Sequence, residues 1–380
     1  MDLQYKSKYL KYKNKYLELK NQFGGNYRFF QAVRDCNLEK IKEFFELEVK
    51  VDVNLLCSNN DNYTALIIAS SIGDQALEVV QYLISKGANV NNNTNYERNT
   101  ALMQASKSDN PSSLIIQCLG ENGANFDLED RYCQTALMQA CIIGDNAKPV
   151  VEACIKAGAN INYESMWGNT ALSCASINVD PSLSIIQCLI DNGANINLQN
   201  KYHGDTTLMQ FFNYPYLSQK PQLSNLIYLI ENRANVNLQN TQGYTALMYA
   251  SLYGININEY IKVLIQAGAI LDLQNNDGHS ALYIAKENNN KDILFLLVKE
   301  YIKQLYDGVD PTPSSNPDPI VTDIIALSEV LRFMTFCKIK DVHIDVHSTI
   351  ELVQTLLIDL GFKDTDNLSN LSESIINELC

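Results

Sequence analysis

A short motif that recurs at a nearly constant interval is the feature that most constrains how this chain folds. The triplet Thr-Ala-Leu, or a close variant, recurs with spacings of 36, 35, 35, 36, 39 and 35 residues, beginning at Thr64, Thr100, Thr135, Thr170, Thr206, Thr245 and Ser280. A second mark, Gly-Ala-Asn or a variant, follows 23 residues after the first residue of the triplet in most units. Two signals in phase at such a period predict a linear array of one repeated unit.

The residues of one repeat predict two helices and a hairpin. Threonine or serine at the start of the triplet is a favourable N-cap, because its hydroxyl accepts a backbone N–H of the first helical turn. Alanines such as Ala101 and Ala105 allow close helix packing, while Leu102 is a core residue. A second apolar helix follows, and Gly87 supplies the left-handed conformation that ends it. The Val-Asn and Ile-Asn pairs that come next indicate the arms of a projecting hairpin.

These motifs resemble the ankyrin family, whose repeat has two antiparallel helices and a β-turn. The resemblance covers residues 26 to about 305 and includes an N-terminal capping repeat at Phe29 to Phe45 and a C-terminal one at Ala281 to Val298. It implies about eight units. We therefore predict an all-α ankyrin-repeat solenoid of helix-turn-helix units with projecting β-turns, followed by a small C-terminal helical appendage.

The chain departs from the ankyrin pattern at two kinds of position. Alanine replaces the motif proline, and methionine stands where the family usually has histidine, at Met103, Met138, Met209 and Met248. We expect soft apolar packing to replace the hydrogen bonds of those histidines. Most internal units also carry about two extra residues between their helices, which should widen the connection opposite the hairpins.

The sixth unit is expected to be irregular. It is four residues longer between its two marks than its neighbours, and the added segment includes Pro215 and Pro221. Phe211 stands where other units have alanine, so either the helices splay or the ring turns outward. Arg233 replaces the glycine that ends the second helix. These features predict either a protruding loop over residues 211–222 or a weak joint in the stack, and we favour the loop.

Charge and cysteine content limit the function. The net charge is −14, and the first 25 residues carry six lysines against Asp2 and Glu18, so the rest of the chain carries −18. Such a body repels phosphates, which disfavours a nucleic-acid ligand. The ten cysteines form no CxxC pair, and several lie in apolar runs typical of buried thiols in a reducing compartment. Since we find no membrane span and no signal peptide, we expect a cytoplasmic protein.

Composition divides the chain into four segments. Residues 1–25 form a Lys/Tyr-rich leader helix, 26–308 the ankyrin repeat domain, 309–319 a Pro-rich linker, and 320–380 a helical C-terminal segment. The leader also resembles one that recurs on proteins of giant DNA viruses, which implies an address tag and host-cell cytoplasm. Gly24-Gly25 is either a flexible hinge or a processing site.

We find no catalytic motif, and we expect neither enzyme activity nor a cofactor. Asp341, His343, Asp345 and His347 alternate with apolar residues, which would place them on one face of a short strand. Such a row is either a polar strand edge or a zinc site. Ligands two residues apart rarely converge on one tetrahedral ion, so the polar edge is favoured.

The family resemblance implies that a protein partner binds the hairpin tips and the exposed inner-helix face. Aromatic residues and arginine recur at these positions, and such residues dominate binding hot spots. The alternative for each is that it packs on the neighbouring tip. The candidate partner-binding residues are Tyr96, Arg131, Tyr132, Met166, Trp167, Tyr202, His203, Tyr214, Tyr244 and Tyr253.

Two classes of function follow. The first is a monomeric protein–protein interaction scaffold or adaptor that binds its partner through the concave surface. The second is a substrate-recruiting subunit of a ubiquitin ligase, or a regulatory subunit, acting through residues 320–380. The sequence does not identify the partner.

Overall fold

The computed structural model describes residues 26–46, 52–57, 63–107, 110–177, 183–212, 222–253 and 257–306, together with 321, 324–325, 327–328 and 358. The chain divides into two compact units, Met1–Asn195 and Ile196–Cys380. The leader, residues 213–221, the Pro-rich linker and the Asp341–His347 row lie outside the described residues.

Short helices make up the described part of both units. In the first unit residues 26–34 are helical, and the helices that follow are α2 (Leu38–Glu46), α3 (Ala65–Ser70), α4 (Leu77–Ser85), α5 (Ala101–Lys107), α6 (Ser113–Glu121), α7 (Ala136–Ile143), α8 (Lys148–Lys156), α9 (Ala171–Ile177) and α10 (Leu183–Asp191). The second unit contains α11 (Thr207–Phe212), α12 (Leu223–Glu231), α13 (Ala246–Tyr253), α14 (Asn258–Gln266), α15 (Ala281–Glu287) and α16 (Lys291–Tyr306).

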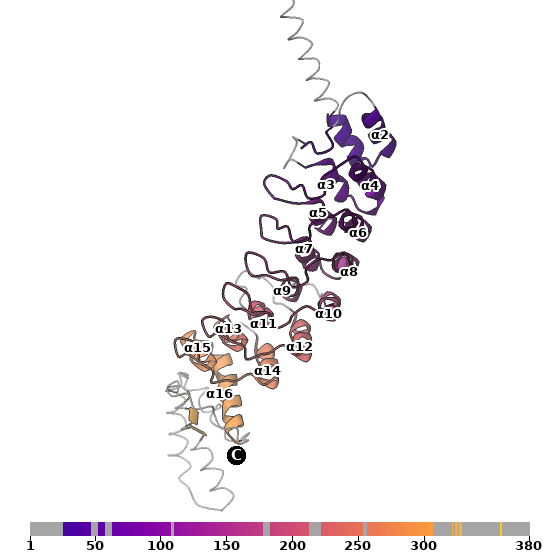
Figure 1. The fold of residues 1–380 in the computed structure, drawn as a ribbon. Coiled ribbons are helices and arrows are strands. Elements are labelled where there is room, and N and C mark those ends of the chain that lie inside the picture. Colours follow the sequence, from indigo (N-terminus) through magenta and orange to yellow (C-terminus); the bar gives the residue numbers. More distant parts are fainter. Residues whose placement is uncertain are drawn as a thin grey trace, which may run out of the picture. The chain divides into compact units, whose positions relative to one another are not determined.

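The two helices of most repeats pack on each other, and the repeats stack within each compact unit. In the first unit the inner helices α3, α5, α7 and α9 pack one on the next, and the outer helices α4, α6, α8 and α10 do the same (Figure 1). In the second unit α11, α13 and α15 form the inner row, and α12, α14 and α16 the outer row. The predicted all-α solenoid of helix pairs is thus confirmed.

The predicted N-caps are present in all seven repeats that carry the Thr-Ala-Leu triplet or its variant. Each triplet's threonine or serine hydroxyl accepts the N–H of the residue three positions later, at 3.1–3.4 Å. In three repeats the N–H of the same threonine also donates to a methionine sulfur, the Sδ of Met103, Met209 or Met248, at 3.4 Å. The methionines therefore give more than apolar packing, since their sulfur also accepts a hydrogen bond.

The predicted helix ends are also confirmed. Gly87 has a φ of 89°, and Ala88 N–H donates to Leu83 O at 3.0 Å, which closes the last turn of α4. Arg233 adopts the same left-handed conformation, with a φ of 70°. A side chain in this conformation costs about 1–2 kcal/mol, so α12 ends less favourably than its counterparts.

The connections between the helices of a pair are not simply wider loops. The extra residues in two of them form 3₁₀ helices, η1 (Asp74–Ala76) and η2 (Asp145–Ala147). Ala76 and Ala147 are buried, so these short helices contribute to the packing of α4 and α8. In these two connections the added residues form regular structure.

Phe211 does not turn outward. Its side chain is buried, with its ring centroid 5.1 Å from that of Phe212 and 6.1 Å from that of Tyr260 on α14. An aromatic side chain of α14 thus lies near the buried ring. The alanines at this position in the other repeats did not indicate such a contact. The predicted loop begins beside this cluster, but residues 213–221 lie outside the described residues, so the loop stays a prediction.

The described cysteines are buried as predicted, with Cys36 the partly exposed exception. All eight are free thiols. Burial raises the pKa of Cys154 and of Cys174 from 9.0 to about 12. The folded state therefore retains protons that the unfolded state loses above pH 9.0, so the free energy of unfolding should fall as the pH rises from 9.0 towards 12.

Site-resolved alkylation tests this burial. We expect iodoacetamide to modify Cys36 in the native chain and to leave Cys154 and Cys174 unmodified, because only an exposed thiolate reacts readily. In denaturant all three should react at similar rates. Peptide mass spectrometry measures the modification at each site, and native-state labelling of Cys154 as fast as that of Cys36 would contradict the packing.

Candidate functional site

Each projecting hairpin is organised around one buried polar residue at its tip. These residues are Thr94, Asp130, Ser165, Asn200, Asn240 and Asn275. At Asp130 the carboxylate Oδ1 accepts the N–H of Tyr132 at 2.8 Å and of Gln134 at 2.9 Å. Its Oδ2 accepts from Gln139 Nε2 at 2.7 Å, which anchors the tip to α7. The tip backbone is therefore hydrogen-bonded without any neighbouring strand.

Close packing between successive tips restricts the backbone further. Gly243 has a φ of 79°, and a Cβ there would lie 2.8 Å from both Asn275 Cα and Asn276 N of the next hairpin. In the same hairpins Asn276 N–H donates to Gln242 O at 3.0 Å. Such contacts hold each tip against the next.

Asparagine side chains join the arms of successive hairpins. Asn91 Oδ1 accepts the N–H of Asn125 at 2.7 Å, and Asn91 Nδ2 donates to Gly123 O at 3.2 Å. Equivalent pairs of hydrogen bonds are made by Asn54 and Asn162 in the first unit and by Asn197 and Asn237 in the second. The hairpins within each unit therefore form a braced row.

Several candidate residues are more exposed to solvent than the other large hydrophobic side chains of the described chain. Six large hydrophobic side chains of the described chain are more than half exposed. Five of them are predicted partner-binding residues, namely Tyr96, Tyr132, Met166, Trp167 and Tyr202. The sixth is Tyr27, near the start of the described residues. Exposed large apolar groups are thus concentrated on the hairpin tips.

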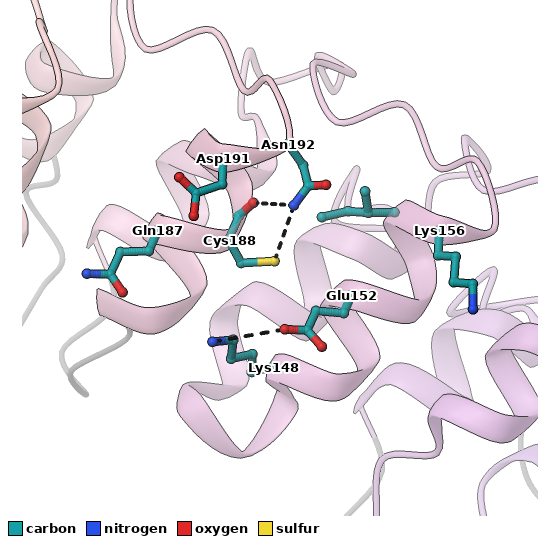
Figure 2. Close-up of a pocket in the computed structure, with 8 residues that line it drawn as sticks. Lys148, Glu152, Lys156, Gln187, Cys188, Asp191 and Asn192 are labelled. Atoms are coloured by element: carbon teal, nitrogen blue, oxygen red, sulfur yellow. Dashed lines mark hydrogen bonds and ion pairs between the residues drawn. The ribbon is translucent and has the colours of Figure 1, made fainter.

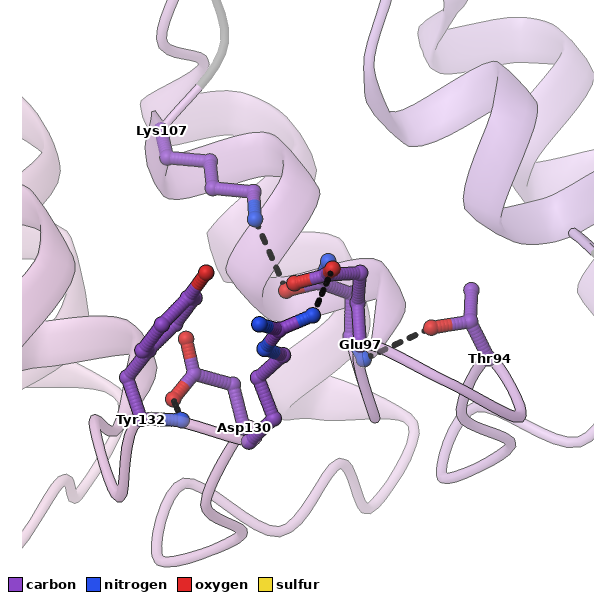
Figure 3. Close-up of polar contacts among 7 residues, drawn as sticks. Thr94, Glu97, Lys107, Asp130 and Tyr132 are labelled. Carbon is purple, nitrogen blue, oxygen red and sulfur yellow. Dashed lines mark hydrogen bonds and ion pairs between the residues drawn. The ribbon is translucent and has the colours of Figure 1, made fainter. Parts of the chain in front are cut away.

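Arg131 joins two tips of the first unit. Its Nη1 lies 2.8 Å from Glu97 Oε1, and its guanidinium carbon lies 4.4 Å from the ring centroid of Tyr96 and 4.6 Å from that of Tyr132. Figure 3 shows Glu97 and Tyr132 near Lys107, whose Nζ donates to Asn99 Oδ1 at 2.8 Å. Burial lowers the pKa of Lys107. Arg131 is therefore largely engaged by its own chain.

Trp167 and Met166 are anchored through their polar groups while their side chains remain exposed. Trp167 Nε1–H donates to Cys133 Sγ at 2.8 Å, and Met166 N–H donates to Glu129 Oε1 at 2.9 Å. The Trp167 side chain is nevertheless 71% exposed. Packing on the neighbouring tip and exposure to a partner thus occur together at this residue.

The candidates in the second unit differ in exposure. Tyr202 and His203 are exposed, and the His203 carbonyl accepts from Thr241 N at 2.8 Å. Tyr244 is half-buried, with its ring centroid 5.3 Å from that of Tyr249. Tyr253 ends α13, but its side chain lies outside the description, as does all of Tyr214. Tyr202 is the most exposed aromatic candidate described in this unit.

A family model for ankyrin repeats matches the chain in three copies, at residues 29–130, 102–200 and 216–307. The chain belongs to the ankyrin repeat family. Among solved structures it is similar to the ankyrin repeat domain of Bcl-3, a member of the IkappaB family, with 24% identity and a TM-score of 0.48 over 62% of this chain and 99% of that one. None of the curated proteins compared with the chain matches it.

Two further structures show similarity over a comparable length. One is the human ASB11 ankyrin repeat domain, with 20% identity and a TM-score of 0.49 over 63% of this chain and 97% of that one. The other is a Bdellovibrio bacteriovorus structure of the endopeptidase Bd0816 in complex with the immunity protein Bd3460, with 26% identity and a TM-score of 0.42 over 52% of this chain and 97% of the matched chain.

The inner helices of the ankyrin units offer little exposed surface. The first six residues of α5, α7 and α9 are all buried. Exposed side chains occur only at the helix ends, as at Lys107 and Ile142. Neither residue is aromatic and neither was predicted as a binding residue, although its position seven residues after Thr100 or Thr135 is a usable signal. The hairpin tips, rather than the inner helices, supply five of the six large hydrophobic side chains that are more than half exposed in the described chain.

The outer helices carry two shallow grooves beside α8. One, of about 530 Å³, lies between α8 and α10 and is lined mainly by polar side chains (Figure 2). Lys148 pairs with Glu152 at 4.0 Å, and Asn192 Nδ2 donates to Cys188 O at 2.8 Å. The other groove, of about 470 Å³, lies between α6 and α8.

The described residues contain no group of three or more His, Cys, Asp or Glu side chains arranged to hold a metal ion. The Asp341–His347 row lies outside this description, so both interpretations of it stay open. Within the same described ranges, no helix is both long and apolar enough to cross a membrane.

Stability measurements distinguish a surface role from a packing role for Trp167. We expect Trp167→Ala to lower the free energy of unfolding by less than about 1 kcal/mol, because an exposed side chain loses little burial. Leu172→Ala, which truncates a buried residue of the adjoining α9, should cost about 2–5 kcal/mol. Chemical denaturation of both variants checks this, and similar losses would show that Trp167 is a packing residue.

Proposed function

We propose that this ankyrin repeat protein is a non-enzymatic scaffold or adaptor that binds a partner protein through its hairpin tips. The observation that carries the proposal is that five of the six most exposed large hydrophobic side chains in the described chain lie on those tips. The described helices keep their large apolar side chains mostly buried, so this exposure is not a general property of the surface.

The construction of the tips also favours binding. Their backbones are held by Asp130, Ser165 and their equivalents, and by contacts to adjacent tips. A surface that is ordered before binding loses less conformational entropy when a partner docks. Tryptophan and tyrosine, which dominate measured hot spots, are the residues presented here.

A binding role also agrees with the character of the family, whose repeats bind proteins. The free thiols of the described cysteines support a reducing compartment, and we place the chain in the cytoplasm, as a monomer. The acidic body disfavours nucleic acid as its ligand.

Affinity capture from the natural cell, with full-length protein as bait, tests the binding role. Wild type should retain a partner that Trp167→Ala binds about 30-fold more weakly, corresponding to a hot-spot loss of about 2 kcal/mol. Leu114→Ala, which truncates an exposed apolar side chain on the outer helix α6, should bind like wild type. Loss of the partner with Leu114→Ala but not with Trp167→Ala would contradict the proposal.

A truncation after Val309 separates the two functional classes. If residues 320–380 recruit a second protein, such as a ubiquitin-ligase component, the truncated bait should lose that protein and retain the partner held by the tips. A plain scaffold should show the same captured proteins with and without the C-terminal segment.

A further inference from the structure

Two hairpins of the first unit, residues 125–134 and 160–169, form a surface of distinct chemistry. We name as the acidic–aromatic patch the residues Asp127, Glu129, Tyr163, Met166 and Trp167. Met166 and Trp167 are more than half exposed, and Glu129 Oε1 accepts the N–H of Met166 at 2.9 Å. Asp127 is exposed on the preceding hairpin, two residues before Glu129. Burial, followed by the charges of Glu129 and Asp127, raises the pKa of Tyr163 on the second hairpin.

The charge of this patch is not balanced within its hairpins. Arg131 is the one basic residue in residues 125–134 and 160–169, and its guanidinium is directed to Glu97 of the preceding hairpin, at 2.8 Å. Asp130 is buried and its oxygens hold the tip. Asp127 and Glu129 therefore keep negative charge on the hairpin that precedes Trp167, the most exposed large hydrophobic side chain of the described residues.

Asp127 departs from the bracing pattern of the hairpin arms. Asn54, Asn91 and Asn162 occupy the equivalent position in the other hairpins of this unit, and each donates its amide N–H to a carbonyl of the next hairpin. A carboxylate has no N–H to donate, so Asp127 cannot make that bond. The aspartate gives up part of the brace and places a charge on the surface, which indicates a role in binding rather than stability.

The adjoining pair of tips already shows how this surface chemistry holds a cation. There the Arg131 guanidinium lies between the rings of Tyr96 and Tyr132 and pairs with the Glu97 carboxylate. The acidic–aromatic patch offers the same components, with Trp167 as the ring and Asp127 and Glu129 as the carboxylates. Among aromatic side chains, tryptophan attracts a cation most strongly.

We propose that the acidic–aromatic patch binds a lysine or arginine side chain on an extended, otherwise apolar segment of the partner protein. This inference rests on the proposed function, and it specifies the chemistry of the partner. Met166 supplies an adaptable apolar contact for the residues beside that cation. The negative charge attracts a basic segment and repels a phosphate backbone.

Selection of a displayed random-peptide library on the immobilised full-length chain tests the proposal. Peptides enriched on wild type relative to Trp167→Ala should contain Lys or Arg flanked by apolar residues. The most enriched peptide should bind Asp127→Asn about tenfold more weakly, as expected for the loss of one charge-assisted contact. Its affinity should also fall as the salt concentration rises.

Two controls separate a binding effect from a folding effect. Asp127→Asn restores the amide donor, so its melting temperature should equal or exceed that of wild type while its affinity falls. Glu121→Gln removes the same charge from the outer helix α6 and should leave the affinity unchanged. Equal losses in these two variants would indicate only long-range attraction by an acidic protein and would overturn the inference.

The remaining outcomes separate a failure of this inference from a failure of the proposed scaffold function. Enriched peptides that are neutral or acidic, yet depend on Trp167, overturn the inference and leave the scaffold role intact. A wild-type chain that enriches nothing over Trp167→Ala contradicts both. Preference for a single-stranded DNA oligonucleotide over every peptide would likewise overturn the assignment of a basic partner.

Discussion

The structure depends on how the backbone N–H and C=O groups of the hairpins form hydrogen bonds without a β-sheet. The described chain contains one isolated β-bridge, Asn93 to Thr100, so ladder hydrogen bonds cannot hold the projecting segments. A buried N–H or C=O without a partner costs free energy comparable to a lost hydrogen bond. Side-chain oxygens of residues such as Asp130 and Asn240, and amides such as Asn91, supply the missing partners. The hairpins are thereby fixed at modest cost.

In this arrangement the helices provide the stability and the hairpins present the exposed side chains. The helix pairs bury the apolar residues and bind their neighbours within each unit, which is the nearest-neighbour stability expected of a repeat array. The tips carry few core residues, so their outward side chains can vary with little loss of stability. Trp167 and Tyr202 are free to serve recognition, whereas Leu172 is not.

The repeated local signals were predictable from the sequence because each acts within a few residues. Thr64 caps its own helix, Gly87 ends the next, and Arg233 takes over that role despite its side chain. The fate of individual aromatic residues was harder to predict. Tyr244 packs on Tyr249 while Tyr202 remains exposed.

The contacts that escaped prediction join side chains of neighbouring repeats. Arg131 is held by Glu97 and Trp167 by Cys133, each 34 residues earlier, and Phe211 is buried against Tyr260. Periodicity identifies which residues share a position in the repeat, but not which side chain meets which across the stack. The amide bonds of Asn54, Asn91 and Asn162 to the next hairpin are contacts of the same kind, and periodicity alone does not show that Asp127 lacks the N–H to make one.

Oxidative footprinting of the captured complex tests most directly the claim that rigid hairpin tips form the binding surface. The account predicts that partner binding protects Tyr96, Tyr132, Met166 and Trp167 from hydroxyl radicals, while Leu114 on the outer helix α6 reacts at an unchanged rate. Protection of Leu114 and the α6–α8–α10 face, with the tip residues still reacting as in the free chain, would contradict it.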